Sequence, residues 1–303
     1  MDPIARPGRE RTLIPARPSI DELQDALLRG GYLADRGLAT VLALALGLRR
    51  PVLLEGEAGV GKTEVAKCLS EICGTQLIRL QCYEGIDASQ ALYEWDYARQ
   101  LLSMKMLSEG GGPQDVQELF GPDFLLERPL LQALRLGNRA VLLIDEIDRA
   151  DDEFEAFLLE VLSDFQVTIP EIGTIRAAEP PAVILTSNRT RELHDALKRR
   201  CLFHWIDYPA LEREVEIVRL RVPEVPGALA AQVVQAVALM RRMNLVKRPG
   251  VAETLDWARA LAYLGADVLS PELIEQTAGV VVKEREDVAE VSRSLHGLMG
   301  NGG

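Results

Sequence analysis

The sequence has 303 residues, of which 48% are hydrophobic and 26% are charged. At about 100–200 residues per domain, this length and composition predict about two globular domains. The sequence has 46 acidic and 34 basic residues, so its formal net charge is −12. A field of that sign repels phosphate polyanions, which disfavours a protein that coats DNA or an anionic membrane by bulk electrostatics.

The first residues and the cysteines indicate the cellular compartment in which we expect the protein. Residues 1–18 are rich in proline and arginine and lack the apolar core of a secretory signal, so we interpret them as a flexible tail. The longest nearly apolar stretch, 38–48, is shorter than the about 20 residues that cross a bilayer as a helix, so we expect no membrane span. The four cysteines show no C-x-x-C spacing. They predict reduced thiols in a cytoplasmic protein.

Helical and strand-like patterns alternate through the first two thirds of the chain. Ser19 stands three residues before Glu22, which is the signature of a capping box and predicts a first helix there. A second helical run covers 38–48. Near-continuous apolar runs of strand length follow at 51–54, 77–80, 141–144 and 182–186, separated by helical patterns. This order predicts a largely parallel α/β sheet covered on both faces.

After Tyr208 and Pro209 the pattern becomes helical only. Runs with a 3.6-residue period cover 211–220, 226–243, 251–264 and 271–291. We therefore expect an αβα domain over 19–208 and an all-helical domain over 209–303.

The run that follows the strand at 51–54 has the composition of a phosphate-binding loop. It reads G-x-x-x-x-G-K-T without a mismatch, and a helical pattern at 64–73 follows; its members are Gly56, Glu57, Ala58, Gly59, Val60, Gly61, Lys62 and Thr63. Glycines let successive backbone N–H groups turn toward an anion, and the next helix presents its positive end. Lys62 would reach the phosphates of ATP and Thr63 would hold Mg²⁺. A chance glycine turn before a helix is the alternative.

Two carboxylates stand at the end of the strand at 141–144. Ligands bind at the C-terminal ends of strands in such sheets, and a strand this apolar tolerates paired acids only there. Asp145 would fix Mg²⁺, and Glu146 would polarise the water that attacks the γ-phosphate. The alternative makes Glu146 the capping acid of a helix that begins near Asp151.

Polar groups further along the chain suit the same chemistry. Asn188 follows the strand at 182–186, where an amide can orient the attacking water, although asparagine also caps helices. Arg199 and Arg200 end a predicted helix, and an arginine there could stabilise phosphoryl charge or simply interact with the helix dipole. The histidines form no metal-like cluster; the nearest approach is Cys201-x-x-His204.

The order of these motifs resembles an AAA+ ATPase. More narrowly, LIDEIDRA at 143–150 followed by 154–168 and 207–209 resembles the MoxR family, and 82–102 resembles its CoxD-like branch, which accompanies molybdenum carbon monoxide dehydrogenases. The resemblance covers roughly residues 31–265. It implies a parallel αβα sandwich followed by a helical lid.

The resemblance also implies roles for individual residues. Lys62 and Thr63 match Walker A, Asp145 and Glu146 match Walker B, and Asn188 matches sensor 1. Arg200 falls where the arginine finger would lie, with Arg199 as the alternative. The family's sensor 2 arginine usually follows Ser-Pro, whereas this chain has Lys247-Arg248-Pro249-Gly250; Arg248 is the candidate.

Two hairpins complete the expected architecture. Tyr93, Trp95 and Tyr97 alternate with acids, which predicts a strand with one aromatic face. That strand is either part of an insert hairpin at about 83–128 that faces a ring pore, as the resemblance implies, or an edge strand whose rings pack on the core. Residues 166–176 predict a second hairpin, which resembles the pre-sensor hairpin of this clade.

The resemblance implies an ATP-hydrolysing chaperone that assembles as a homo-oligomeric ring, a hexamer, and uses ATP and Mg²⁺. It further implies a von Willebrand A-domain partner and a client metalloenzyme such as carbon monoxide dehydrogenase, whose maturation the ring would assist. A DNA-linked AAA+ motor is one alternative, which the net charge of −12 disfavours. A P-loop small-molecule kinase is the other.

Overall fold

The computed structural model describes residues 18–108 and 119–299. The predicted tail, apart from Pro18, therefore lies outside the described residues. The described chain forms two compact units. The first comprises 18–30, 34–55 and 63–205, and the second comprises 31–33, 56–62 and 206–299.

A five-stranded sheet lies at the centre of the first unit, with the strand order β2-β5-β8-β1-β9. The strands are β1 (Val52–Gly56), β2 (Gln76–Gln81), β5 (Ala140–Asp145), β8 (Ala182–Ser187) and β9 (Leu202–Ile206). The pairs β2–β5, β5–β8 and β8–β1 are parallel. Every residue of β5 is buried, as expected of a central strand covered on both faces. The predicted parallel α/β sheet is confirmed.

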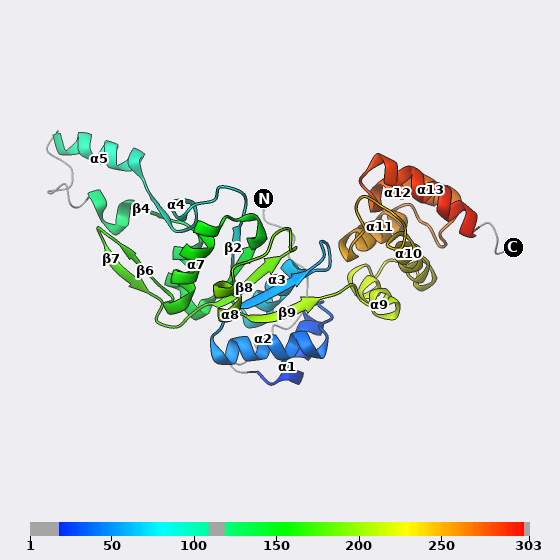
Figure 1. Cartoon of the computed structure of the whole chain (residues 1–303), viewed down its shortest axis with the longest axis horizontal. Coiled ribbons are helices and arrows are strands. Elements are labelled where there is room, and N and C mark those ends of the chain that lie inside the picture. Colours follow the sequence, from blue (N-terminus) through cyan, green and yellow to red (C-terminus); the bar gives the residue numbers. More distant parts are fainter. Residues whose placement is uncertain (1–17, 109–118, 300–303) are drawn as a thin grey trace. The chain divides into compact units, whose positions relative to one another are not determined.

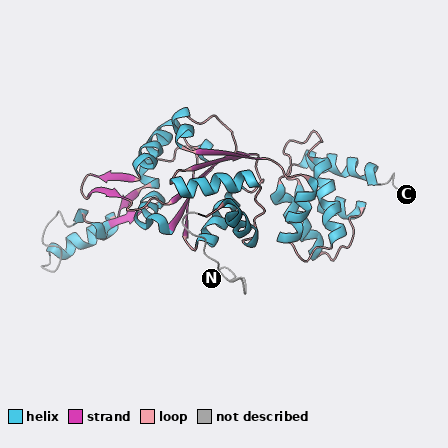
Figure 2. Cartoon of the chain, turned by 90° about the horizontal axis from the view of Figure 1, so that it is seen from below, coloured by secondary structure: helices cyan, strands magenta, loops and turns pink. Residues whose placement is uncertain are grey.

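Helices cover both faces of this sheet (Figures 1 and 2). They are α1 (Ile20–Arg29), α2 (Arg36–Leu48), α3 (Lys62–Cys73), α6 (Pro129–Leu136), α7 (Asp152–Asp164) and α8 (Asp195–Arg200). The first begins as the sequence indicates: the Ser19 side chain accepts a hydrogen bond from Glu22 N, and Glu22 reaches back to Ser19 N. This reciprocal capping satisfies amide groups that the first helical turn leaves open.

An insert separates β2 from β5 and contains α4 (Ala88–Ala91), β3 (Tyr93–Trp95), α5 (Tyr97–Ser108) and β4 (Leu125–Glu127). Strand β3 pairs antiparallel with β4. The predicted strand through Tyr97 is too long, because Asp96 accepts a hydrogen bond from Arg99 N and so starts α5. Trp95 is buried, and the rings of Tyr93 and Trp95 meet edge to face at 5.9 Å. These two rings pack on the core, as the edge-strand interpretation predicts.

A second hairpin follows α7. Strand β6 (Gln166–Ile169) pairs antiparallel with β7 (Gly173–Arg176), and Gly173 closes the turn with a φ of 94°. The hairpin expected at 166–176 is therefore present. Figure 2 shows both small antiparallel pairs at the same end of the first unit, near α5.

The second unit is helical beyond β9, with α9 (Leu211–Arg221), α10 (Gly227–Met240), α11 (Val251–Tyr263), α12 (Pro271–Val281) and α13 (Arg285–Met299). The single helix predicted over 271–291 is wrong. The Lys283 ammonium donates to the carbonyls of Gly279 and Val280 and so ends α12. In α13, the buried Asp287 accepts from the amides of Val246 and Lys247. Among the described residues, no helix is long and apolar enough to span a bilayer.

Candidate nucleotide-binding site

The glycine-rich loop connects β1 to α3 and adopts backbone conformations that glycine favours. Gly56, Gly59 and Gly61 have φ values of 156°, 78° and 97°. A Cβ on Gly59 would lie 2.9 Å from Glu253 Oε2 and 3.0 Å from Gly250 Cα, so any side chain there would clash as well as strain the backbone. The loop therefore needs glycine at this position for two independent reasons.

Lys62 curls into its own loop. Its side chain is buried, and its ammonium donates to the carbonyls of Gly56 and Glu57 at 2.7 Å each. These contacts hold a positive charge inside the loop that the sequence predicts to cradle phosphate. Of the other loop positions, Glu57 and Ala58 are exposed and Val60 is buried.

The loop also contacts the beginning of α11 within the second unit. Ala252 N donates to Gly59 O at 3.1 Å. A Cβ on Gly250 would lie 2.7 Å from both Ala58 O and Gly59 Cα, so the two backbones approach at van der Waals distance only because both residues are glycine.

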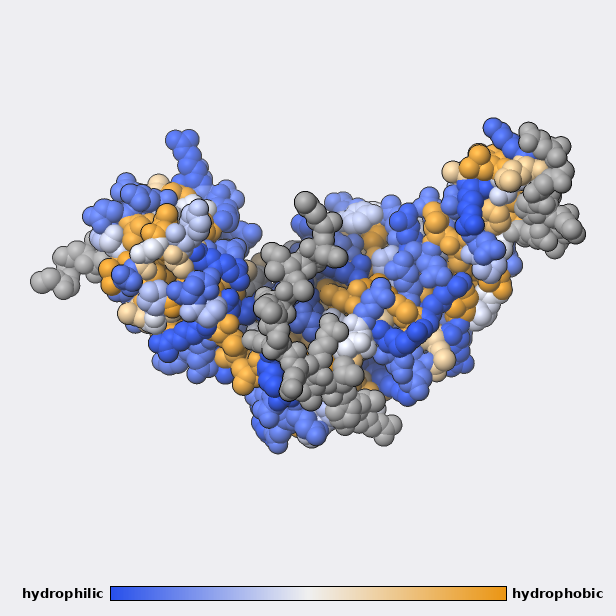
Figure 3. Space-filling view, turned by 180° about the vertical axis from the view of Figure 1, so that it is seen from behind, coloured by the Kyte–Doolittle hydropathy of each residue, from blue (hydrophilic) through white to orange (hydrophobic). Residues whose placement is uncertain are grey.

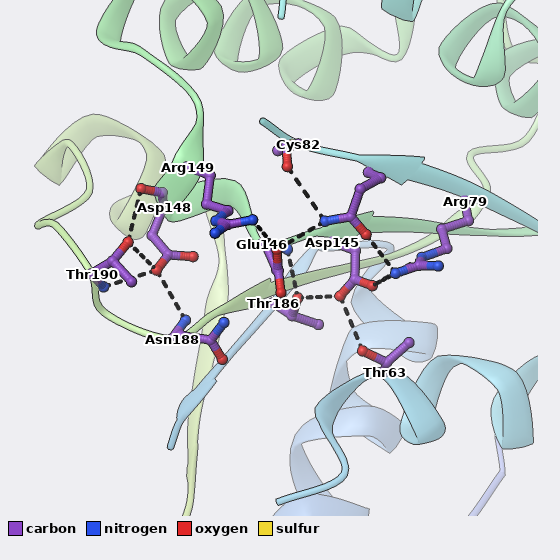
Figure 4. Close-up of polar contacts among 11 residues, drawn as sticks. Thr63, Arg79, Cys82, Asp145, Glu146, Asp148, Arg149, Thr186, Asn188 and Thr190 are labelled. Carbon is purple, nitrogen blue, oxygen red and sulfur yellow. Dashed lines mark hydrogen bonds and ion pairs between the residues drawn. The ribbon is translucent and has the colours of Figure 1, made fainter. Parts of the chain in front are cut away.

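Asp145 ends β5 and is 2% exposed. Its Oδ1 accepts from the hydroxyls of Thr63 at 3.1 Å and Thr186 at 2.6 Å, and its Oδ2 accepts from Arg79 Nε at 2.9 Å. Figure 4 shows these donors converging on the carboxylate. A hydroxyl beside a fixed carboxylate, at the start of the helix that follows the loop, is a pair of hard oxygen ligands that fits Mg²⁺.

Glu146 adopts a left-handed conformation with a φ of 55°. Its amide donates to Thr186 Oγ1 at 2.9 Å, and its carboxylate accepts from Gln81 Nε2 at 3.0 Å and from Arg149 Nη1 at 3.3 Å. The alternative role as cap of the next long helix is not observed, because Asp151 caps α7 by accepting from Phe154 N at 2.9 Å.

Asn188 follows β8 and so lies beside the end of β5. The backbone N–H of Asn188 donates to Asp148 Oδ2 at 3.2 Å. Figure 4 shows Asn188 on the same edge of the sheet as Glu146. The structure thus brings together Thr63, Asp145, Glu146 and Asn188 in the first unit.

The three arginines assigned by resemblance lie in different settings. Arg200 ends α8, and its Nη1 donates to Leu159 O at 3.3 Å and to Ser163 Oγ, both in α7. Arg199 is exposed, and its guanidinium has no hydrogen bond or ion pair within the described residues. Arg248 lies on an exposed stretch before α11 in the second unit.

The pKa of Tyr208 depends on several nearby charged side chains, and Arg248 is one of them. Burial raises the pKa of Tyr208 above its usual range and Glu57 adds to the rise, while Arg241 and Arg248 oppose it. Arg248 therefore lies within electrostatic reach of Tyr208, which is also close to the loop residue Glu57.

The cysteines supply no reactive group to this edge of the sheet. Burial, together with the neighbouring carboxylates of Asp145, Asp148 and Glu146, raises the pKa of the Cys82 thiol to about 12, so the thiol stays protonated. His204 lies 3.9 Å from Asp35. Within the described residues, no three histidine, cysteine or acidic side chains form a metal-binding group.

Sequence patterns did not single out four side chains of the site: Arg79, Gln81, Asp148 and Thr186. Each had a visible signal. Arg79 and Gln81 alternate with apolar residues in β2, Thr186 is a polar residue in a buried strand, and Asp148 comes three residues after Asp145. The signals are weak because such residues are also common on solvated strand faces.

A glycine loop between strand and helix, followed by an acidic strand end in a parallel sheet, defines the P-loop nucleotide-binding class. Residues 51–201 match the family described as the AAA domain (dynein-related subfamily). These residues are therefore an AAA domain of that subfamily, and the protein carries an AAA+ ATPase domain.

The matched relatives and solved structures cover from 53% to 94% of this chain. An uncharacterized protein of Staphylococcus haemolyticus is 28% identical over 80% of this chain and 87% of the relative. One of Staphylococcus aureus is 31% identical over 53% of this chain and 57% of its own length. Among solved structures, the Thermotoga maritima RuvB Holliday junction branch migration motor has a TM-score of 0.46 at 20% identity, covering 90% of this chain and 75% of RuvB. A RuvB mutant from the same organism scores 0.49 at 19% identity, covering 94% and 86%.

Proposed function

We propose that this protein is a Mg²⁺-dependent ATPase whose hydrolysis cycle remodels a client protein. One observation carries the catalytic part: Thr63 Oγ1 and Thr186 Oγ1 converge on the buried Asp145, while the next residue, Glu146, turns its carboxylate away to Gln81. The two adjacent carboxylates thus accept hydrogen bonds from separate donors and have separate roles. Asp145 serves the metal side, and Glu146 serves the attacking water.

The residues divide the work as follows. Backbone N–H groups of 56–62 and the Lys62 ammonium bind the phosphates, and the ammonium exchanges its contacts with Gly56 and Glu57 for phosphate oxygens. Thr63 and Asp145 would hold Mg²⁺, which would neutralise charge on the phosphates. Glu146 accepts a proton from the attacking water as general base, and Asn188 donates a hydrogen bond that orients that water or the γ-phosphate.

The remodelling part of the proposal is supported by the MoxR-like residues at 143–150 and by the surface of the insert. Helix α5 exposes large apolar side chains, among them Tyr97, Leu101, Leu102, Met104 and Met106. Figure 3 shows hydrophobic residues gathered on this part of the first unit. Exposed apolar surface of this kind marks contact with other proteins. We propose a homo-oligomeric ring, a hexamer, in the cytoplasm, with a von Willebrand A-domain partner and a metalloenzyme client such as carbon monoxide dehydrogenase.

The test separates binding from hydrolysis. Glu146→Gln should bind ATP as the wild type does and hydrolyse it at least about 100-fold more slowly, because it loses the general base. Lys62→Ala should lose ATP binding. Glu160→Gln, which neutralises an exposed glutamate on α7, is the matched control and should behave as the wild type. Normal turnover by Glu146→Gln would overturn the catalytic assignment.

The client is identified with the same variant. Glu146→Gln loaded with ATP is held in the nucleotide-bound state, so a client or partner should remain attached when the complex is purified from native cell extract. Recovery of an A-domain protein together with a metalloenzyme would support the proposal. Recovery of a replication or repair complex, or ATPase activity stimulated by DNA and weakened by salt, would overturn it.

A further inference from the structure

Two turns at the catalytic edge of the sheet hold strained backbone conformations. Strands β5 and β8 pair with each other up to Ile144 and Leu185, and the two strands end soon after, at Asp145 and Ser187. Glu146 in the first turn has a φ of 55°, and Arg189 in the second has a φ of 57°. Residues with a Cβ rarely occupy this region, so other contacts must hold both turns in place.

A single buried carboxylate joins the two turns. Asp148 is 2% exposed. Its Oδ2 accepts from Asn188 N at 3.2 Å, from Thr190 N at 2.8 Å and from Thr190 Oγ1 at 2.7 Å. Thr190 Oγ1 also lies 3.2 Å from Asp148 O. Figure 4 shows these bonds running from the segment after Glu146 to the segment that carries Asn188.

The position of the two amides explains how Asp148 holds the strain. They flank Arg189, the residue with the positive φ, so both N–H groups point to the same side of the chain and form a small anion-binding nest. A carboxylate in this nest makes charge-assisted hydrogen bonds, which are stronger than neutral ones. Without the carboxylate, Arg189 can relax to a negative φ, and the amides on either side then turn away from one another.

We propose that Asp148 is a positioning residue for the hydrolysis of ATP: it fastens the turn that carries Asn188 to the turn that carries Glu146, so that the two side chains act on one water molecule in a fixed geometry. This inference rests on the proposed ATPase function. It assigns Asp148 no contact with nucleotide, and it leaves the phosphate-binding loop unaffected.

The test substitutes Asp148 and follows turnover separately from binding. Asp148→Asn keeps the shape but loses the charge, and we expect its kcat to fall about 10- to 100-fold through misplacement of Asn188, with the Kd for ATP unchanged. Thr190→Val deletes one of the donors to Oδ2 and should give a smaller loss in the same direction. Asp152→Asn is the control, because it neutralises an exposed carboxylate of the following helix.

Rescue distinguishes positioning from a general loss of stability. Glycine adopts a φ of 57° without steric cost, so Arg189→Gly in the Asp148→Asn background should restore part of kcat. Arg189→Ala should not, although it removes the same contacts of the Arg189 side chain with Glu55 and Trp205. Equal rescue by glycine and alanine would overturn the proposal, as would an unchanged kcat or parallel losses of kcat and ATP affinity.

Hydrogen exchange tests the same bonds without turnover. The amides of Asn188 and Thr190 should exchange faster in Asp148→Asn than in Asp152→Asn, and unchanged protection would overturn the inference on its own. Failure of the wild type to hydrolyse ATP would instead contradict the proposed function. The two failures are therefore distinguishable.

Discussion

The Thr186 hydroxyl has both of its hydrogen-bonding roles filled by the acidic strand end. It donates to Asp145 Oδ1 at 2.6 Å and accepts from Glu146 N at 2.9 Å. Thr186→Val keeps the shape but leaves a buried carboxylate oxygen and an amide with fewer partners, so we expect a loss of about 1–3 kcal/mol in the free energy of unfolding. Urea unfolding measures this loss.

The control for Thr186→Val is Thr168→Val. Thr168 pairs with Thr174 at 3.0 Å on the exposed hairpin, where water can replace the lost hydroxyl. This substitution should leave the unfolding free energy nearly unchanged. Equal losses for the two variants would show that the acidic strand end does not depend on the Thr186 hydroxyl.

The buried thiols predict a loss of stability at high pH. Burial raises the pKa of Cys82 and of Cys201 to about 12 in the folded protein. An unfolded thiol loses its proton near pH 8.5, so between about pH 9 and pH 12 the folded state binds more protons than the unfolded state. The stabilisation from each protonated thiol is therefore fully present below about pH 8.5. Between about pH 9 and pH 12, each thiol lowers the free energy of unfolding by about 1.4 kcal/mol per pH unit.

Urea unfolding of Cys82→Ala and Cys201→Ala at several pH values between 8 and 11 checks this pH dependence. Each variant should lose less stability over that range than the wild type, after its own offset from the lost packing is subtracted. Identical slopes in the wild type and both variants would contradict the raised thiol pKa values.

Among the individual site residues, the sequence predicts those that belong to contiguous motifs. It misses those that only the fold brings together. Thr63, Asp145 and Glu146 were predictable because the glycine loop and the apolar strand mark their positions. Gln81 was not, because its contact with Glu146 depends on β2 lying beside β5. The two residues are 65 positions apart in the sequence, and the contact forms only once the two strands are neighbours in the sheet.

The contact between the phosphate-binding loop and α11 links two elements through backbone atoms. Gly250→Ala adds a methyl group that would lie 2.7 Å from Ala58 O and Gly59 Cα, so the loop and the helix must separate. Overpacking of this kind costs about 1–3 kcal/mol, which corresponds to about 5- to 150-fold in the Kd for ATP if the loop itself shifts. Titration with ATP measures this change.

Gly279→Ala is the matched control in the same unit. A Cβ on Gly279 meets no atom within 4 Å, and the residue lies inside α12, so alanine should raise stability by about 0.5–1 kcal/mol and leave ATP affinity unchanged. If Gly250→Ala binds ATP as tightly as Gly279→Ala does, the contact with α11 does not shape the loop.

Element boundaries failed where side chains end an element that periodicity alone would continue. Residues 93–97 alternate as a strand, yet Asp96 caps α5, which begins at Tyr97. Residues 271–291 read as one helix, yet Lys283 closes α12 and the buried Asp287 faces the amides of Val246 and Lys247. In each case a polar side chain finds backbone partners that only the folded chain supplies, and this overrides local propensity.

For the assembled protein, the proposal of a ring requires an arginine that acts on the nucleotide of a neighbouring subunit, which is worth about 10³–10⁵ in rate. ATPase activity per subunit should therefore rise with protein concentration over the range in which rings form. Turnover measured beside light scattering checks this, and a rate independent of concentration over a range where the mass changes would exclude a finger supplied in trans.

Arg199 and Arg200 can then be separated by what each does within its own subunit. Arg200 donates to Leu159 O and Ser163 Oγ, so Arg200→Ala should lower the free energy of unfolding as well as turnover. Arg199 has no such partner within the described residues, so Arg199→Ala should lower turnover only if Arg199 acts on a neighbour.

Mixing subunits decides between them. Lys62→Ala subunits cannot bind ATP but still carry both arginines, so adding them to an inactive arginine variant should restore turnover at sites where a Lys62→Ala subunit supplies the missing group. Restored activity for one arginine variant and not the other identifies the finger. Where the arginine variant is inactive alone, as Lys62→Ala is, activity in the mixture can arise only at a site shared by two subunits. If the inactive arginine variant stays inactive in the mixture, the result contradicts the ring mechanism.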